Sequence, residues 1–328
     1  MFLSIIIPCY KVEHFLPKTI LSLKSLEDAS DCEFVFVNDG SPDNIHEIIS
    51  KFKQEDNRVV YINQTNQGVS AARNAALDVV KGKYIYLLDG DDYLEKNAVK
   101  IIKENIDGVD MLIPSLNYVY VKERKRVSNP IVTKTVEHTP DELFRALLVF
   151  PTTPMIVYRR ELISNNQLRF NNDIKCGEVY DFTISVMEYA NRIKLLPDCI
   201  YNYVWHEEGA TKKVNCAADV TVLNLLQHFS AISQSWTKST TFLLTAFKMV
   251  TSFTINKYIR HNLCDHDVLC AVDMVLENKL FRTLLCDLKN RPIPLQSKIL
   301  VIYLLYIPRE VSYKIAIRIW NLFKKQTN

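Results

Sequence analysis

Short apolar runs alternate with helical patterns through the first third of the chain. The runs are continuous rather than alternating, which is typical of strands buried on both faces of a parallel sheet. Between them, apolar residues recur at helical spacing. Strands that alternate with helices in this way predict βαβ units, so we expect an α/β fold with a mostly parallel sheet. The expected strands cover residues 3–7, 33–37, 59–62 and 84–88, and the expected helices cover 14–26, 45–52 and 71–80.

The middle of the chain has a weaker but related pattern. Residues 110–121 form another apolar-rich stretch that predicts a strand, and 155–158 predict a short one. The basic stretch 122–134 is interpreted as a flexible loop, and residues 140–150 as a helix.

The pattern changes after Cys216, where long stretches are apolar at helical spacing only. We therefore expect two domains, an α/β domain over residues 1–215 and a helical region over 216–328. The last expected helix is basic and amphipathic, and it carries Trp320. Such a helix suits an anionic membrane surface, although an ordinary helix packed on its neighbours has the same pattern. The expected helices are 219–232, 240–260, 266–288 and 295–323.

Net charge, cysteine pattern and the length of the apolar stretches argue against several classes of protein. The net charge is +3 over 328 residues, which is too small to suggest a nucleic-acid partner. The eight cysteines are scattered without a Cys-x-x-Cys pair, and no basic leader precedes the first apolar run, so we expect free thiols in a reducing cytosol. No stretch approaches the roughly 20 apolar residues that span a bilayer. We expect a cytoplasmic protein that associates at most peripherally with the inner face of the membrane.

Polar residues follow the end of each expected strand in the first domain. Ligands of parallel α/β sheets bind beyond the carboxyl ends of the strands, so these segments should converge on one edge. The last one, Asp89-Gly90-Asp91-Asp92, places three carboxylates around a glycine. Mg²⁺ or Mn²⁺ would relieve their repulsion and could hold a substrate diphosphate, whereas the simpler alternative is a solvated acidic turn. The segments are Pro8–Tyr10, Asp39–Ser41, Asn66–Gly68 and Asp89–Asp92.

Other nucleotide motifs do not match. The first strand is not followed by Gly-x-Gly-x-x-Gly, which argues against a dinucleotide oxidoreductase, and Gly82-Lys83 is followed by Tyr84 rather than Ser or Thr, so it is not a P-loop.

These segments together resemble the catalytic domain of family 2 glycosyltransferases, which have the GT-A fold. The resemblance covers residues 3–110 and continues more faintly to Thr211. Asn38 stands where the family motif has its first Asp. The resembling motifs are Ser4-Ile5-Ile6-Ile7-Pro8-Cys9-Tyr10, Val37-Asn38-Asp39-Gly40-Ser41, Asn66-Gln67-Gly68 with Ala71-Ala72-Arg73-Asn74, and Asp89-Gly90-Asp91-Asp92.

The resemblance implies a nucleotide-sugar site with a Rossmann-like, mostly parallel sheet behind it. Pro8 and Tyr10 would line the nucleotide base, and Asp39 would accept a hydrogen bond from a uracil-like imide. Arg73 would reach the ribose or the diphosphate, a task suited to its planar donors. Ser41, Gly68 and Gly90 belong to the same implied site.

The resemblance also implies a metal site. Asp91 would bind Mn²⁺ or Mg²⁺ directly, and Asp89 would contact the ribose and the metal. Residues 201–211 resemble a tyrosine-rich strand and the loop that covers the donor in the family, so His206 becomes a candidate ligand of the metal or the diphosphate.

One segment departs from the family pattern. Gly177-Glu178-Val179-Tyr180-Asp181-Phe182 resembles Gly-Glu-Asp-x-x-Phe, whose Asp is the general base, but valine occupies that position and cannot accept a proton. Three interpretations remain open. Asp181 replaces the base, which is our first choice; Glu178 does so; or the protein is a weak or inactive relative. Glu178 and Asp181 would share a helix face at i and i+3.

We therefore expect a metal-dependent inverting glycosyltransferase that uses a nucleotide sugar, with UDP as the nucleotide. Its acceptor would be a glycan or a lipid-linked glycan of the cell surface. Two other classes compete, a catalytically silent nucleotide-sugar-binding or scaffold protein, because of Val179, and a metal-dependent phosphatase that uses Asp89 and Asp91.

Overall fold

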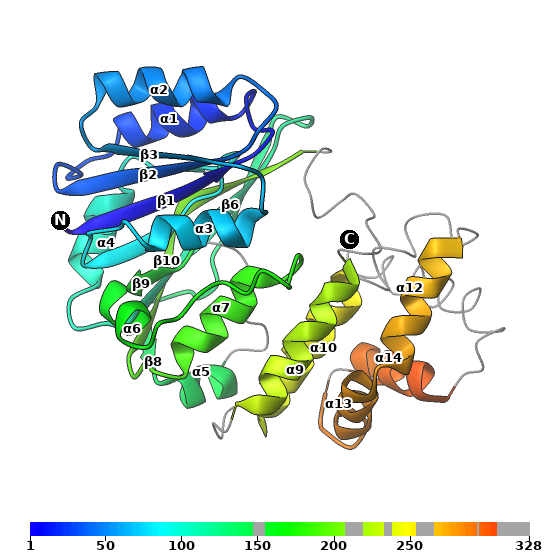
Figure 1. Ribbon diagram of the computed structural model, residues 1–328. Coiled ribbons are helices and arrows are strands. Elements are labelled where there is room, and N and C mark those ends of the chain that lie inside the picture. The colour runs from blue at the N-terminus through cyan, green and yellow to red at the C-terminus, as the bar shows by residue number, and fades with distance from the viewer. Residues whose placement is uncertain (147–154, 207–218, 233–237, 254–265, 294, 307–328) are drawn as a thin grey trace. The chain divides into compact units, whose positions relative to one another are not determined.

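The computed structural model describes residues 1–146, 155–206, 219–232, 238–253, 266–293 and 295–306 (Figure 1). Contacts within the chain divide it into two compact units. The first comprises Met1–Leu143, Pro151–Asn172 and Glu178–Gly209, and the second comprises Phe144–Phe150, Asp173–Gly177 and Ala210–Asn328.

The first unit is built on a ten-stranded sheet whose main path runs β3-β2-β1-β4-β9-β6-β10-β5. Strands β1 to β4, β6 and β10 run parallel, because β9 pairs antiparallel with both β4 and β6. The sequence prediction of a mostly parallel sheet is therefore confirmed. The strands are β1 Leu3–Cys9, β2 Cys32–Asp39, β3 Val59–Gln64, β4 Tyr84–Leu87, β5 Tyr93–Leu94, β6 Met111–Tyr120, β7 Lys125–Asn129, β8 Val136–His138, β9 Val157–Arg159 and β10 Ile193–Trp205.

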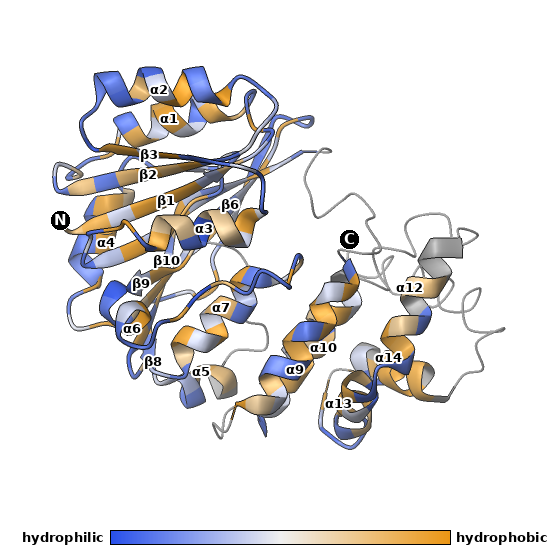
Figure 2. Cartoon of the chain, in the orientation of Figure 1, coloured by the Kyte–Doolittle hydropathy of each residue, from blue (hydrophilic) through white to orange (hydrophobic). Residues whose placement is uncertain are grey.

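Helices cover both faces of the sheet. Figure 1 shows α1 and α2 on one side of β1 to β3 and α3 on the other. On α2, Ile45, Ile49 and Phe52 are buried at helical spacing, which gives the one apolar stripe of a surface helix. Every residue of β1 and β2 is buried. In Figure 2 hydrophobic colour predominates along β1, whereas β2 also carries hydrophilic colour at its polar residues. The helices of this unit are α1 Leu16–Lys24, α2 Ile45–Glu55, α3 Val69–Leu77, α4 Ala98–Asn105, α6 Arg160–Asn165 and α7 Glu178–Met187, and α5 Pro140–Ala146 begins in this unit and ends in the second.

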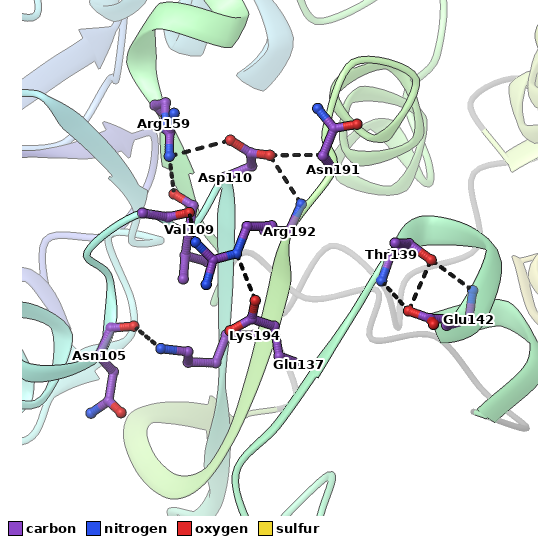
Figure 3. Close-up of polar contacts among 11 residues, drawn as sticks. Asn105, Val109, Asp110, Glu137, Thr139, Glu142, Arg159, Asn191, Arg192 and Lys194 are labelled. Atoms are coloured by element: carbon purple, nitrogen blue, oxygen red, sulfur yellow. Dashed lines mark hydrogen bonds and ion pairs between the residues drawn. The ribbon is translucent and has the colours of Figure 1, made fainter.

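A buried carboxylate holds together the amino-terminal ends of β6 and β10. Asp110 Oδ2 accepts hydrogen bonds from the backbone N–H groups of Asn191 and Arg192, at 2.7 and 3.0 Å (Figure 3). Arg159 Nη2 lies 3.4 Å from Asp110 Oδ1, and Arg192 Nε donates to Glu137 Oε1 on β8 at 2.6 Å. This network fixes the register of β6 against β10 at the edge opposite their carboxyl ends.

The structure corrects two of the expected elements and adds a helix that was not expected. Residues 125–129 form β7, which pairs with β6 as a hairpin, so the prediction of a loop over 122–134 is wrong for this part. The single helix expected over 266–288 is two, because the Asn278 side chain accepts a hydrogen bond from Phe281 N and begins a new helix there. Helix α4 was not expected, although Ala98, Val99 and Ile102 are buried at helical spacing.

The second unit is helical in the parts that the structure describes. Its elements are the 3₁₀ helix Val220–Val222 and the α-helices α9 Leu223–Ala231, α10 Thr240–Phe253, α12 His266–Glu277, α13 Lys279–Lys289 and α14 Leu295–Tyr306. Most of the expected basic amphipathic helix, including Trp320, falls outside the described residues. Among the helices described, none has both the length and the apolar character to span a membrane.

Gly82 should be intolerant of any side chain. A Cβ there would lie 2.5 Å from Ser4 N and 2.7 Å from Ser4 Oγ, the atom to which Gly82 N donates a hydrogen bond of 2.8 Å. Gly82→Ala should therefore lower the free energy of unfolding by about 1–3 kcal/mol, the usual cost of overpacking. Urea denaturation followed by circular dichroism measures it.

Gly108→Asn provides the matched control for this prediction. Gly108 has φ +66°, which asparagine tolerates, and its added Cβ would meet only the end of the flexible Arg192 side chain, at 2.8 Å. It should cost clearly less than Gly82→Ala, and equal losses would contradict the steric argument.

Candidate functional site

The candidate site lies where the strand order reverses. The chain passes from β1 outward to β2 and β3 and then returns to β4 on the other side of β1. Ligands of open α/β sheets bind at such a switch point, beyond the carboxyl ends of the strands. The turn after β1 and the acidic segment after β4 meet there. A Cβ on Gly90 would lie 3.0 Å from Pro8 O and 3.3 Å from Cys9 Sγ, so any side chain here would force the two turns apart by a few tenths of an ångström.

Three carboxylates gather at the end of β4. One oxygen each of Asp89, Asp91 and Asp92 lies within 4.8 Å of the others. The Asp91 side chain is 28 % exposed, and its Oδ2 lies 2.9 Å from His206 Nε2. Phe15 lies against the imidazole, with ring centroids 4.2 Å apart. The structure thus brings His206 to the acidic segment, although the two are more than a hundred residues apart in the chain.

Asp92 has a different environment from the other two. It is 2 % exposed, and its Oδ2 and Oδ1 accept hydrogen bonds from Tyr201 Oη at 2.5 Å and Val204 N at 2.7 Å. Burial, followed by the charges of Asp91 and Asp89, raises the pKa of Asp92 well above its ordinary value. The hydrogen bonds of Asp92 therefore connect the acidic segment to β10. Asp89 and Asp91 are less buried, so they are the carboxylates that a ligand can contact.

Two side chains that the sequence did not identify support this segment. Thr19 of α1 is fully buried, and its Oγ1 donates to Gly90 O or Asp92 O, at 3.0 and 2.7 Å. Tyr201 Oη accepts a hydrogen bond from Asp89 N at 3.3 Å. A hydroxyl on the apolar face of α1 was the available signal for Thr19, and the tyrosine-rich strand was the signal for Tyr201.

Arg73 is held between two carboxylates rather than directed at solvent. It is 2 % exposed, Nη2 donates to Asp89 Oδ1 and Nη1 donates to Glu178 Oε1, both at 2.8 Å. Its guanidinium also lies 5.3 Å from the centre of the Phe170 ring. Despite this cation, burial raises the pKa of Asp89, with the charges of Asp91 and Glu178 acting in the same direction. Arg73 thus connects the acidic segment with the start of α7.

Asp39 anchors the loop that follows β3. Its Oδ1 accepts from Gln64 Nε2 and Gln67 N at 2.8 and 2.9 Å, and its Oδ2 accepts from Gly68 N at 2.8 Å. Gly68 has φ +92°, a conformation that favours glycine, and so directs its N–H toward the carboxylate. Oδ2 accepts one bond here and retains capacity for a second.

The remaining predicted contacts lie on the turn after β1. Pro8 is buried within β1, whereas the Tyr10 ring is 43 % exposed at the rim. Ser41 Oγ accepts a hydrogen bond from Lys11 N at 2.7 Å and donates to Asp43. Ser41 therefore joins the turns that follow β1 and β2.

Helix α7 carries the segment in which the base is expected. Val179 is 5 % exposed and Asp181 is 3 % exposed, so both side chains are buried. Glu178 lies at the first position of α7, where its side chain is 15 % exposed and reaches Arg73. In the part of the chain that the structure describes, Glu178 Oε2 accepts no hydrogen bond. Of the two candidate bases, Glu178 is the one whose contacts lead to the acidic segment.

Comparison with known proteins agrees with this arrangement. Residues 4–166 match the model of glycosyl transferase family 2. Through this domain the chain belongs to that family. It is 33 % identical over 207 residues to the uncharacterized glycosyltransferase EpsJ of Bacillus subtilis, and 28 % identical over 211 residues to the poly(ribitol-phosphate) beta-N-acetylglucosaminyltransferase TarS of Staphylococcus aureus. These matches cover 61 % and 63 % of this chain but 60 % and 36 % of the two relatives.

Solved structures of S. aureus TarS share the fold. A structure of S. aureus TarS 1–349 in complex with UDP superposes with a TM-score of 0.69 at 19 % identity, covering 99 % of this chain and 92 % of that one. The same fragment in complex with UDP-GlcNAc gives 0.66 at 20 % identity. The prediction of a glycosyltransferase α/β fold is confirmed.

The acidic segment suits a divalent cation. Hard cations such as Mg²⁺ and Mn²⁺ prefer carboxylate oxygens, and Asp89 and Asp91 offer them at short mutual distance on the exposed side of the segment. His206 Nε2 lies at the same place and adds a nitrogen that Mn²⁺ accepts. The residues therefore fit the metal that the family resemblance implies.

Proposed function

We propose that the protein is a metal-dependent inverting glycosyltransferase that takes its sugar from a UDP-sugar. The observation that carries the proposal is the convergence of Asp89, Asp91 and His206 at the switch point of the sheet. The relatives support it, because one TarS structure holds UDP and another UDP-GlcNAc. The catalytic domain would comprise residues 1–215, with a helical region over 216–328.

In this proposal the donor binds beyond the carboxyl ends of β1 and β4. The uracil would lie between the Tyr10 ring and the loop anchored by Asp39, with Pro8, Ser41 and Gly68 in its walls. Asp89 and Asp91, with His206, would hold Mn²⁺ or Mg²⁺, which when bound supplies positive charge to the leaving diphosphate. Arg73 would keep Asp89 in place and add its own charge nearby.

Inversion requires one in-line displacement, in which a carboxylate removes the proton of the acceptor hydroxyl. Glu178 is our first choice for this base, because its Oε1 is fixed by Arg73 while its Oε2 remains available. Asp181 is the second choice, since its carboxylate is buried. The acceptor would be a glycan or lipid-linked glycan of the bacterial surface. An anionic polyol polymer is the first to test, because TarS and a Bacillus spizizenii relative are named as enzymes acting on poly(ribitol phosphate).

The test of this function is sugar transfer from UDP-GlcNAc or UDP-glucose to a ribitol-phosphate oligomer with Mn²⁺ present. Isothermal titration with UDP, with and without Mn²⁺, tests the donor site separately. Metal-dependent UDP binding together with transfer supports the proposal. Because Val179 is buried at the position of the family base, a silent nucleotide-sugar-binding protein is the second candidate. UDP binding with no transfer to any acceptor would favour it.

The identity of the base can be tested by three substitutions. Glu178→Gln should reduce transfer by about 10²–10⁴-fold, the usual loss when a general base is removed, with UDP affinity nearly unchanged. Asp181→Asn should have a clearly smaller effect. Val179→Asp should change little if Glu178 already acts as the base. Steady-state kinetics with saturating donor measures all three. A large loss in Asp181→Asn alone would instead assign the base to Asp181.

Association with the membrane remains a prediction. The expected basic stretch after Pro308 lies outside the described residues, so the proposal rests on its sequence pattern alone. Sedimentation of the full chain with anionic vesicles, compared with a chain ending at Tyr306, would test whether that stretch binds a membrane surface.

A further inference from the structure

We infer that the carboxyl ends of β6 and β10, with the hairpin that joins β6 to β7, form the acceptor subsite, and that this subsite takes a polyhydroxylated chain linked by phosphodiesters. The inference rests on the proposed function, because it assigns the second substrate of the same reaction. It depends on two features, a strip of aromatic rings and a group of basic residues beside it.

The aromatic strip consists of Tyr118 and Tyr120 on β6 and Tyr203 and Trp205 on β10. The register pairs Tyr118 with Tyr203 and Tyr120 with Trp205, so all four side chains project from one face of the two strands. The ring centroids of these pairs are 5.9 and 5.8 Å apart, and those of Tyr118 and Tyr120 are 6.4 Å apart. All four rings are partly exposed. A core cluster would bury them, so this surface offers ring area to a ligand.

The strip lies at the edge of the sheet that carries the donor site. Strands β6 and β10 run parallel to β1 and β4, and Figure 1 shows β10 ending on the side toward which β1 points. Tyr201, two residues before Tyr203 and on the same face of β10, donates its hydroxyl proton to Asp92. His206, directly after Trp205, contacts Asp91. With a rise of about 3.3 Å per residue, the strip begins about 7 Å along β10 from Tyr201.

The basic group lies on the hairpin next to the strip. Residues 122–126 read Lys-Glu-Arg-Lys-Arg and are all exposed. Lys125 pairs with Tyr120 across β6 and β7, and directly opposed residues project from the same face, so its side chain leaves the sheet on the face that carries the strip. Arg126 projects from the other face and pairs with Glu95 at 2.6 Å. Within the described part of the chain, Arg124 and Lys125 form no ion pair and remain available to an anion.

The two features recognise different parts of one ligand. Aromatic rings present flat apolar area at low entropic cost, on which the C–H faces of a sugar or an extended polyol can pack. Arginine and lysine attract phosphate, and arginine binds it in a bidentate manner. A neutral glycan would contact the aromatic strip but would gain nothing from the charges of the hairpin. In the proposed function the nucleotide donor binds elsewhere, at the switch point. A phosphodiester-linked polyol uses both features.

The experiment measures transfer from UDP-GlcNAc and UDP-glucose to a ribitol-phosphate octamer, with maltoheptaose as the neutral probe and a hyaluronan octasaccharide as the carboxylated one. Trp205→Leu and Tyr120→Leu keep apolar bulk but remove a ring, and each should raise the acceptor KM about tenfold. Lys125→Gln should raise the KM for the phosphate octamer and weaken its salt dependence. Donor hydrolysis without acceptor and UDP affinity should be unchanged in all three.

Matched controls are Tyr189→Leu, an exposed tyrosine that is 44 % exposed at the end of α7, and Lys51→Gln on the outer side of α2. Neither should alter the acceptor KM. Acceptor KM values within twofold of wild type in both ring variants would overturn the inference, while normal UDP binding would leave the proposed function standing. Equal or better use of maltoheptaose or hyaluronan by the wild type would overturn the assignment to phosphodiesters.

If the wild type shows no transfer, titration of the octamer followed by tryptophan fluorescence tests the same surface. Binding that is lost in Tyr120→Leu and Lys125→Gln supports the subsite, and absence of binding to the wild type overturns it.

Discussion

Replacing Arg73 with methionine should produce one of the largest losses of stability available to a single substitution in this chain. The guanidinium is 2 % exposed and neutralises Asp89 and Glu178 at 2.8 Å each. Its removal leaves two carboxylates together without a cation, and breaking a buried ion pair in this way costs about 3–5 kcal/mol. Urea denaturation followed by circular dichroism measures the loss.

The matched control is Arg169→Met, whose arginine pairs with Asp78 at the surface, where the side chains are 46 % and 62 % exposed. Surface pairs contribute little, so its urea midpoint should remain close to that of the wild type. The double variant Arg73→Met with Glu178→Gln should lose less free energy of unfolding than the sum of the two single variants. The second change removes one of the two carboxylates that Arg73→Met leaves without a cation. Strict additivity would show that Arg73 does not couple to Glu178.

Replacing Asp91 with asparagine should abolish metal-dependent binding of UDP while the fold is retained. Asp91 is partly exposed, and among the described residues its side chain forms a hydrogen bond with His206 only, so the substitution removes a charge and a metal ligand without opening a cavity. The loss of metal affinity should exceed the roughly 10–100-fold that follows loss of an outer partner of a metal ligand. Titration of UDP into the variant with and without Mn²⁺ measures it.

Asp107→Asn is the control, because Asp107 is an exposed carboxylate on the turn between α4 and β6. It should bind UDP and metal as the wild type does. Equal UDP affinity of Asp91→Asn and wild type in the presence of Mn²⁺ would remove Asp91 from the metal site. A variant that unfolds would instead give Asp91 a structural role like that of Asp92.

The elements that the sequence predicted correctly are those with strong local signals. Strands β1 and β2 contain the apolar runs 5–7 and 34–37, and α2 has a clear apolar stripe, so burial of these residues favours the observed conformations. Strand β7 was missed because four of its five residues are polar and all five are exposed, so only pairing with β6 makes them a strand. Such a strand has no hydrophobic pattern of its own to detect.

The site was predictable in outline for a similar reason. Parallel βαβ topology places the loops after β1, β2 and β4 at one edge, and this follows from the order of elements alone. The sequence could therefore group Tyr10, Asp39 and Asp91 without knowledge of any contact. The prediction that Arg73 reaches the donor could not anticipate its two carboxylate partners, because Glu178 lies 105 residues away in the chain.

The sequence by itself determined which residues of this protein can carry charge, metal and hydrogen bonds, and at which edge of the sheet they gather. The tertiary structure decided how the carboxylates are used. In the sequence Asp92 resembles Asp91, and Asp181 is as good a candidate base as Glu178. In the structure the side chains of Asp92 and Asp181 are buried, whereas Asp91 stays partly exposed. Burial depends on what packs over a side chain, and that is set by contacts between segments distant in the chain rather than by local pattern.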